Sequence, residues 1–545
     1  MTGSRPPRDR GEAEEPEATF GRYSTRTGID GLDDDRALEL AGRLTDLSLD
    51  LGRREGLERT VKLIEELQTR DLSPDRAAVS HYFLGNAWGN LRSLSGRNPH
   101  DWEQPELEHE VYHHRVALLG AGVEGLEQRR VCQILTNLGN TMSQVGRSVE
   151  AVEYWDRALT ELPNFSMARG ARGYHLSYYA RYLHDPGHEA LMLKFAHADV
   201  EEALSPVGRR LLEGRSHEAF ESTKTYIEGY LSTEYLLADP EVEGFTLGDS
   251  EEEIEYRRWC LDNRLFLNPL NDLGPYPVAA VDVLVLPTIV TNHEEGPSGP
   301  SILGLYNQLK QEFVSARYLY YEGTRPQYTH FSDKDVRLYD TFDHPAYSLA
   351  VEKTKISFRM AYSILDKVAF FLNGYLGLGV PDAKVYFRTI WYEDQKKARG
   401  LAPAFREAEN WPLRGLFWVS KDLFENEPGF RDALEPDARE LKEIRHALEH
   451  RYLKLHEVFW PGPGDDYGGA SPQAIAALKD SLAVSRYRRD FEAKALRLLK
   501  LVRASLIYLC LAVHREEEKR SNERDPKQEV PMMRAHFFED VRKLS

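Results

Sequence analysis

The stretch KEIRHALEHRYLKLHE, residues 442–457, brings three histidines and two arginines close together. An imidazole titrates near neutral pH, so His450 is suited to moving a proton. A guanidinium stays charged and offers a fork of donors, so Arg445 is suited to stabilising charge that develops on a phosphate. The same letters also contain an H-x-x-E-H pattern (His446, Glu449, His450), in which two histidines one helical turn apart can bind zinc. The residue types therefore admit two unrelated chemistries.

The spacing alone does not choose between these chemistries. An arginine and a following histidine with four to six residues between them also occur at Arg325/His330, Arg337/His344, Arg439/His446 and Arg451/His456. On one straight helix, Arg445 and His450 lie about 140° apart, so they do not share a face. A ligand common to both would lie at the edge of a groove or between two copies of the helix.

Length and composition limit what the rest of the chain can be. A chain of 545 residues is too long for one ordinary core and predicts two to four domains. The hydrophobic content of 41% and charged content of 29% are typical of a folded, soluble protein. The net charge of −18 excludes a protein that coats nucleic acid without specificity. Any RNA site must therefore be a local basic cleft.

Compartment signals favour the cytoplasm. The cysteines at 132, 260 and 510 are few, distant and odd in number, which argues against a disulfide framework or a cysteine metal site. The apolar run LIYLCLAV (506–513) is too short to cross a bilayer, and the N-terminus lacks the apolar core of a secretory signal. We expect no association with membranes.

The N-terminal half carries a repeat signal. Residues 132–165 follow the 34-residue tetratricopeptide (TPR) pattern, with matches at Leu138, Gly139, Ala151, Trp155, Ala158 and Pro163. Weaker neighbouring units extend the prediction to a TPR-like helical solenoid over 30–240, after a disordered tail at 1–29. Such a solenoid offers a concave surface for a protein or peptide ligand; the alternative is a purely structural arm.

The remaining chain divides into a joining module and a helical domain. Residues 248–343 are expected to form a small mixed α/β joining segment, with a strand-like run at 277–291. Residues 344–545 are expected to form a bundle of long helices at 345–378, 435–460 and about 472–520, with short strands and turns between the first two. One polar stripe of the first helix is expected to face the 442–457 stretch, and it contains Glu352, Lys355, Arg359 and Asp366.

Three segments of this region together resemble the HEPN superfamily (higher eukaryotes and prokaryotes nucleotide-binding). They are ILDKVAFFLNGYLGL, IRHALEHRYLKL and RRDFEAKALRLLKLVRASLIYLCLAVHR. Two further stretches, EYRRWCLDNRLFLNPLNDL and FRTIWYED, resemble a bacterial HEPN subgroup with N-terminal TPR-like helices. Arg445, His446 and His450 match the family's arginine–histidine motif. The resemblance implies a mainly α fold with a C-terminal HEPN helical bundle and an irregular insert.

The resemblance also implies an activity. HEPN ribonucleases cleave RNA without a metal or other cofactor: a ribose 2′-hydroxyl attacks the neighbouring phosphorus and leaves a 2′,3′-cyclic phosphate. Their site is composed by a homodimer, and roles in toxin systems or defence against phage fit the family. Arg445, His450 and His446 are then the predicted catalytic residues, with the solenoid sensing a partner or gating the site.

A basic run offers RNA-binding residues, for which the alternative is a solvated face. We predict contacts from Arg451, Arg488 and Arg489; the run itself contains Arg486, Arg488, Arg489, Lys494, Arg497, Lys500 and Arg503. Two further interpretations stay open. One is a non-catalytic TPR–HEPN scaffold, and the other is a zinc peptidase with a third ligand among Glu516, Glu517 and Glu518.

Overall fold

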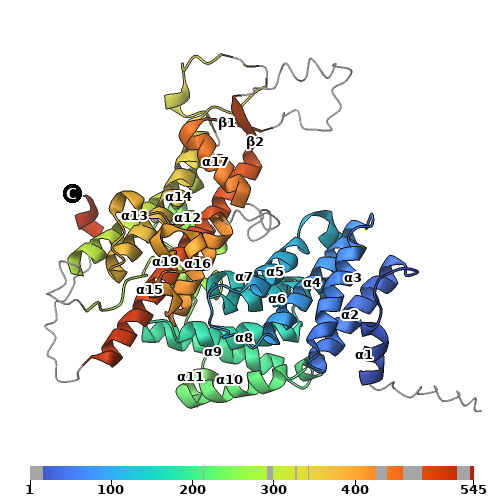
Figure 1. Ribbon diagram of the computed structural model, residues 1–545. Coiled ribbons are helices and arrows are strands. Elements are labelled where there is room, and N and C mark those ends of the chain that lie inside the picture. The colour runs from blue at the N-terminus through green and yellow to red at the C-terminus, as the bar shows by residue number, and fades with distance from the viewer. Residues whose placement is uncertain are drawn as a thin grey trace, which may run out of the picture.

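An arc of paired helices and a bundle of longer helices make up the protein (Figure 1). The computed structural model describes residues 16–212, 214–290, 299–325, 328–339, 341, 343–424, 438–457, 482–524 and 540–544. Within these ranges, no helix is both long and apolar enough to cross a membrane. Both parts are mainly helical, as the sequence predicts.

The arc consists of antiparallel helix pairs stacked side by side. Contacts concentrate within the pairs α2/α3, α4/α5, α6/α7 and α8/α9. The helices are α1 (Pro16–Ser24), α2 (Asp34–Asp50), α3 (Arg54–Leu67), α4 (Pro74–Ser93), α5 (Pro105–Val116), α6 (Gln128–Gln144), α7 (Ser148–Glu161), α8 (Ser166–Ala180), α9 (Pro186–Ala203), α10 (Ser216–Tyr230) and α11 (Thr233–Leu237). This arrangement is the helical solenoid expected over 30–240.

The predicted disordered tail needs a correction. Residues 16–24 form α1, which buries Phe20 against α2 and α3. Charged residues on the exposed sides of α1 hide this single apolar anchor in the sequence pattern. Residues 1–15 lie outside the described part of the chain.

The α6/α7 pair explains why the repeat signal is strongest there. Gly139 on α6 lies against the indole of Trp155 on α7, and a Cβ at Gly139 would come within 2.6 Å of Trp155 Nε1. Ala151 and Ala158 are fully buried at the other small positions. The small residues therefore allow the two helices to approach closely, as the repeat pattern requires.

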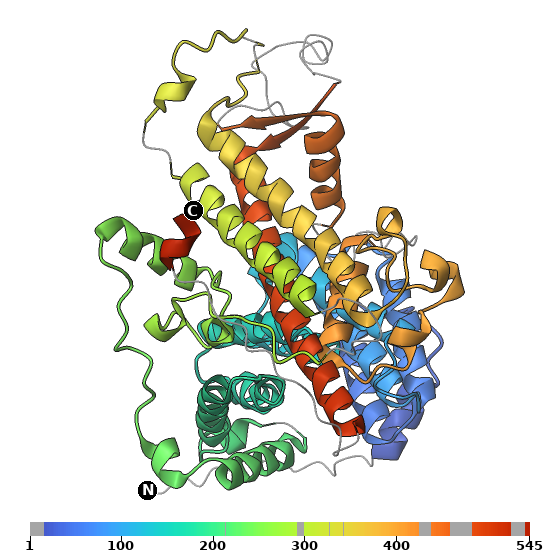
Figure 2. The ribbon, with the colours of Figure 1, turned by 90° about the vertical axis from the view of Figure 1, so that its left-hand side faces the viewer.

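The bundle is built around one long, deeply buried helix, α19. Its helices are α12 (Glu251–Asp262), α13 (Gly299–Gly323), α14 (Leu349–Leu376), α15 (Pro403–Arg406), α16 (Trp411–Phe424), α17 (Ala438–His450) and α19 (Arg488–Glu523). Helices α13, α14 and α19 run alongside one another (Figure 2), and α16 also packs on α19. Helix α14 ends at Gly377, whose left-handed backbone (φ 64°) stops the helix where the sequence predicts.

Short single turns of 3-10 helix punctuate the connections. They are η1 (Gly120–Gly125), η2 (Gly208–Leu211), η3 (Pro269–Asp272), η4 (Pro277–Ala279), η5 (Phe331–Asp333), η6 (Asp382–Lys384), η7 (Glu393–Gln395), η8 (Lys397–Arg399) and η9 (Asp540–Leu544). Three of them, η6, η7 and η8, lie between α14 and α16 among other turns and residues without regular structure, and this segment is the irregular insert expected in the HEPN part.

The predicted helix at 435–460 is wrong at its C-terminal end. Helix α17 ends at His450, and the chain continues as β1 (Tyr452–His456), which pairs in parallel with β2 (Ala483–Tyr487). Leu453 and Leu455 are buried, and Lys454 between them is also buried, where it donates to Asp343 at 2.7 Å. A distant partner strand, which local periodicity cannot reveal, overrides the helical pattern. The third helix accordingly begins at Arg488, after β2, and the first part of its predicted range, 472–481, lies outside the described residues.

Two predicted strand segments are also corrected. Residues 411–424 form α16, which is buried on all sides from Pro412 to Leu423 and so lacks the polar face that marks a helix in a sequence. Within its described residues, the run at 277–291 forms η4 and then no regular secondary structure, and it joins no β-ladder. It packs instead along α19, where Val290 N–H donates to Glu517 Oε2 at 2.9 Å.

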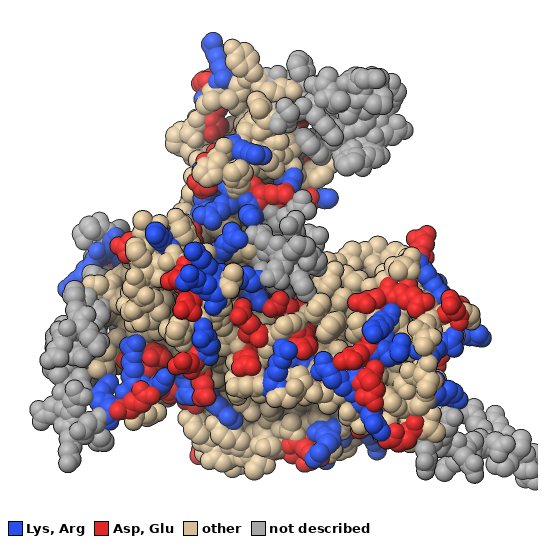
Figure 3. Space-filling model, in the orientation of Figure 1, with Lys and Arg blue, Asp and Glu red and all other residues tan. Residues whose placement is uncertain are grey.

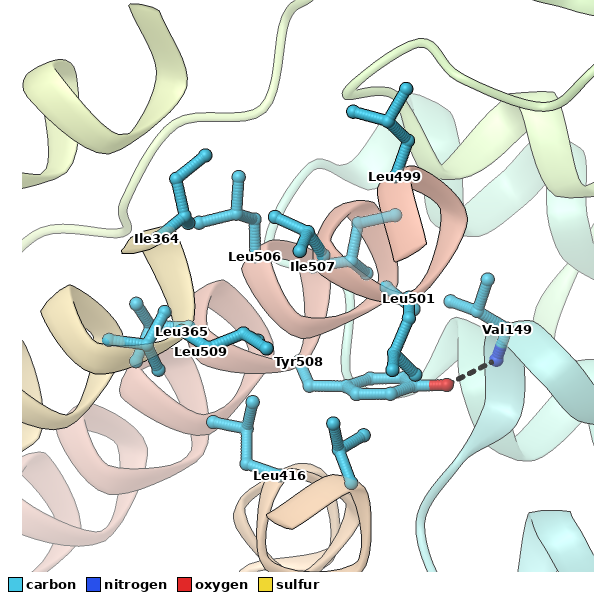
Figure 4. Packing of buried hydrophobic residues seen from close by; sticks show 14 of the residues in the cluster. Val149, Ile364, Leu365, Leu416, Leu499, Leu501, Leu506, Ile507, Tyr508 and Leu509 are labelled. Atoms are coloured by element: carbon cyan, nitrogen blue, oxygen red, sulfur yellow. Dashed lines mark hydrogen bonds between the residues drawn. The ribbon is translucent and has the colours of Figure 1, made fainter. Parts of the chain in front are cut away.

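One hydrophobic core runs from the solenoid into the bundle. Val149 on α7, Leu416 of α16 and Leu501 of α19 belong to the same buried cluster around Tyr508 of α19, whose hydroxyl accepts the Val149 N–H at 3.0 Å (Figure 4). From the loop between α4 and α5, Trp102 enters the bundle, and its indole donates to the Ala408 carbonyl at 3.2 Å. The solenoid is therefore fused to the bundle rather than held out as a free arm.

A close backbone approach between the two parts, at Gly146, predicts a measurable stability effect. Gly146 has φ +88°, and a Cβ there would lie 2.1 Å from the Trp411 carbonyl and 2.8 Å from Gly415 N. We expect Gly146→Ala to lower the free energy of unfolding by about 2–4 kcal/mol, because backbone strain adds to a steric clash. Gly120→Ala is the matched control, since φ is +65° but nothing lies within 4 Å. Urea denaturation measures both; equal losses would show that the close approach is unimportant.

Candidate RNA-binding and catalytic surface

Helix α17 positions the motif through its own apolar face. Leu441, Ile444, Ala447 and Leu448 recur every three or four residues and are all buried. This face packs on α14 and α16. Arg445 consequently lies at the seam with α14, while His446, Glu449 and His450 are exposed.

Arg445 is held at that seam by two contacts with α14. Its Nη2 lies 3.2 Å from Asp366 Oδ2, and its guanidinium stacks over the Tyr362 ring at 4.3 Å from the centroid. The Arg445 side chain is still 41% exposed, so a ligand can reach it. Burial raises the pKa of Tyr362 to about 12, and the nearby Arg445 charge offsets only part of that rise. The ring is therefore a neutral platform for the guanidinium.

Asp366 joins three elements at one carboxylate. Its Oδ2 faces Arg445, and its Oδ1 accepts the backbone N–H of Phe387 at 3.2 Å. Phe387 belongs to the irregular insert that follows α14. The carboxylate thus fixes the position of Arg445 relative to the insert as well as to α14.

The two motif histidines form a solvent-facing pair. Their ring centroids are 5.3 Å apart with an interplanar angle of 57°. Both side chains are exposed, so neither is a buried structural imidazole. His450 follows Arg445 by five positions, which corresponds to about 7.5 Å along the helix axis and about 140° around it. Within one chain, Arg445 and His450 therefore do not converge on a single point.

The polar stripe of α14 divides into two parts. Arg359 donates to the Leu448 carbonyl, which lies in the last turn of α17 and so has no partner within the helix. The Arg359 Nε also lies 3.8 Å from Glu449 Oε1. Glu352 and Lys355 pair with each other at 2.8 Å. Arg359 and Asp366 thus contact the motif helix directly, and no contact with α17 is found for the other two among the described residues.

The basic run does not form an open track for RNA. Lys494, Lys500 and Arg503 are ion-paired with Glu440, Glu153 and Asp272, respectively. Arg488 is only 14% exposed and bonds to Glu492, Glu457 and the Gly323 carbonyl. Arg451 and Arg489 are exposed, although Arg489 Nε lies 3.3 Å from Asp490 Oδ1. Most charges of the run therefore stabilise packing, which neither sequence interpretation anticipated.

Lysine and arginine nevertheless concentrate on one face of the bundle. Figure 3 shows them gathered over the region where Figure 1 places α14, α16 and α17, whereas the solenoid mixes both signs. Exposed basic residues of the insert and its neighbours include Lys384, Arg388, Lys396 and Arg451. The acidic chain thus carries a local basic surface beside the motif.

The zinc arrangement is not assembled by the fold. Glu516 to Glu518 lie at the far end of α19, and the 22 residues from Lys494, which pairs with α17, span about 33 Å of helix. Glu449 is directed toward Arg359. Among the described residues, no group of three or more histidine, cysteine, aspartate or glutamate side chains is arranged to hold a metal. The proposed third ligand is therefore wrong.

Two residues beside Arg445 were missed by sequence reasoning. Tyr362 lies one turn before Asp366 on the same face of α14, so helical spacing was a usable signal. Arg388 follows Phe387 in the irregular insert, where periodicity carries no information. Only the fold brings that insert to the motif.

The fold and site together define a class of protein: a helical bundle that displays an arginine–histidine pair on its surface and is fused to a helical solenoid. Residues 293–516 match the family described as LA2681-like HEPN, so this part of the chain is a HEPN domain and the predicted superfamily is confirmed. The matched segment includes α13, which the sequence assigned to the joining module. No curated protein and no solved structure matches the chain. At family level, a HEPN domain supports a nuclease or other RNA-related role.

Proposed function

We propose that this protein is a metal-independent endoribonuclease of the HEPN type. The observation that carries the proposal is the state of the motif: Arg445 is oriented by Asp366 and Tyr362 yet accessible, and His450 is exposed. An oriented guanidinium and a free imidazole are the groups that phosphodiester cleavage by an internal hydroxyl requires.

In the proposed reaction, the ribose 2′-oxygen forms a bond to the adjacent phosphorus as the P–O5′ bond breaks. His450 accepts the proton of the 2′-hydroxyl, and Arg445 stabilises the negative charge on the phosphate oxygens. The leaving 5′-oxygen takes a proton from a second imidazole, for which His446 is the nearest candidate. The products are a 2′,3′-cyclic phosphate and a 5′-hydroxyl, and no water is consumed.

The separation of Arg445 and His450 around α17 favours a site made by two copies of the chain. In a symmetric dimer, the same patch meets itself, so Arg445 of one protomer can act together with His450 of the other. Such pairing also doubles the local positive charge on an otherwise acidic chain. We propose a homodimer on these grounds. We also propose that a protein or peptide ligand of the solenoid controls the activity, and that the protein acts in a toxin system or in defence against phage.

A non-catalytic scaffold is the second candidate. It is favoured by the ion pair between Arg445 and Asp366, because a carboxylate already neutralises the charge that catalysis needs. In this case, the fused solenoid and bundle serve only to bind partners.

The chemistry of the products tests the proposal. Purified full-length protein is incubated with mixed RNA in excess EDTA, and the new 3′ ends are examined. We expect ends that resist phosphatase until acid opens a cyclic phosphate. Cleavage that disappears in EDTA and returns with added metal would contradict the mechanism, as would products with free 3′-hydroxyls.

A further inference from the structure

The backbone next to Arg388 is fixed on both sides. The Phe387 N–H donates to Asp366, while its carbonyl accepts the Trp391 indole N–H at 2.7 Å and the Ser420 hydroxyl at 2.8 Å. The Phe387 ring itself is completely buried. The insert is irregular in outline, but at this point it is anchored to α14, to α16 and to the core. Arg388 therefore projects from a rigid position.

The Arg388 side chain is exposed and has no counter-ion among the residues that the structure describes. No hydrogen bond or ion pair links it to another residue in the described ranges, whereas Arg399 and Arg406 in the same insert pair with Asp394 and Glu393. The chain has 88 aspartate and glutamate residues against 70 lysine and arginine residues, so acidic partners are plentiful, yet Arg388 pairs with none in the described ranges. Its charge is thus available to an external anion.

Arg388 also lies in the electrostatic surroundings of Arg445. Phe387, its chain neighbour, shares the Asp366 carboxylate with Arg445. Although burial dominates and raises the pKa of the Tyr362 hydroxyl, the charges of Arg445 and Arg388 both act to lower it. The Asp366 carboxylate, which contacts Arg445, acts in the opposite direction on the same hydroxyl. One carboxylate and two guanidinium groups thus surround the Tyr362 ring, and their net positive charge favours an anion.

We propose that Arg388 and Arg445 together bind the phosphate backbone of RNA, with Arg388 holding a phosphate next to the one that is cleaved. This inference rests on the proposed ribonuclease function and names a substrate-binding residue outside the arginine–histidine motif. Arginine suits the task because its planar fork can bind two phosphate oxygens at once. Because Arg388 contacts a non-reacting phosphate, it contributes to binding equally before and during the reaction.

Binding of an RNA that cannot be cleaved tests the inference. Fluorescence anisotropy is recorded with a labelled 2′-O-methyl RNA over a range of salt concentrations. We expect Arg388→Ala to raise Kd about tenfold at low salt and to reduce the salt slope by about 0.7, the value for one lost single-strand phosphate contact. Arg388→Lys should keep most of the salt slope, because it keeps the charge.

Arg399→Ala is the matched control, since Arg399 belongs to the same insert and is already paired with Asp394. We expect its Kd to stay within twofold of the wild-type value. With cleavable RNA at saturation, Arg388→Ala should retain the wild-type cleavage rate and show a raised KM. Thermal melting checks that each variant is folded.

The outcomes separate this inference from the function on which it rests. If the wild type binds and cleaves RNA but Arg388→Ala has the same Kd and salt slope as Arg399→Ala, the inference is wrong and the ribonuclease stands. A loss of the saturated cleavage rate in Arg388→Ala would also overturn it, because Arg388 would then act on the reacting phosphate. If wild-type protein neither binds nor cleaves RNA, both proposals fail.

Discussion

His450→Ala is expected to slow RNA cleavage by about 10²–10⁴-fold, the usual contribution of a positioned general acid or base. Arg445→Ala is expected to cost about 10²–10³-fold, because the charge on the phosphate oxygens loses its oriented partner. Both variants should stay folded, because the Arg445 side chain is partly exposed and the His450 side chain is exposed. Single-turnover cleavage of a defined RNA in EDTA measures both effects.

Glu449→Ala is the control for this pair, because Glu449 is exposed on the same helix and lies between the two motif histidines. We expect its rate to stay close to that of the wild type, whereas a zinc peptidase mechanism requires Glu449 as its base. Unchanged RNA cleavage in the His450→Ala and Arg445→Ala proteins would leave the scaffold as the better description.

Mixing the two inactive variants tests the dimer. If one protomer supplies Arg445 and the other His450, a mixed dimer regains one complete site. Random exchange makes about half of the dimers mixed, each with one site of two, so roughly a quarter of wild-type activity should return. No recovery after verified exchange would mean that each chain forms its own site.

Asp422→Ala is expected to lower the free energy of unfolding by about 3–5 kcal/mol, the usual effect of removing one partner from a buried ion pair. Asp422 on α16 is 1% exposed and receives bonds from Arg115 of α5 at 2.9 and 3.1 Å. Arg147, at the start of α7, bonds to the same carboxylate. The substitution therefore removes a charge that two solenoid arginines share across the interface. Urea denaturation monitored by circular dichroism measures the loss.

Asp394→Ala serves as the comparison, because Asp394 is an exposed partner of Arg399 and such pairs contribute at most about 1 kcal/mol. Burial disfavours the charged form of Asp422, but the two guanidinium groups prevail and lower its pKa below the ordinary value. Its stabilisation is therefore present above about pH 4 and is lost as the pH falls further. If the two aspartate variants unfold at the same urea concentration, the buried cluster does not hold the solenoid to the bundle.

The site shows how far helical spacing can lead. The stripe on α14 correctly singled out Arg359 and Asp366 as neighbours of α17, because side chains three, four and seven residues apart share a helix face. The same spacing could not separate Glu352 and Lys355, which pair with each other instead. A stripe identifies a face but does not say where along the helix the neighbouring element ends.

Sequence alone determined the features that depend on local periodicity and residue type: the solenoid, the long helices, the glycine that ends α14 and the superfamily of the C-terminal part. Only the tertiary structure decided the end of α17, the helical state of the fully buried α16, the acidic partners of the basic run and the approach of Arg388 to the motif. These features depend on contacts between residues far apart in the chain. A buried helix loses its polar face, and an arginine looks the same in a sequence whether it meets a carboxylate or solvent.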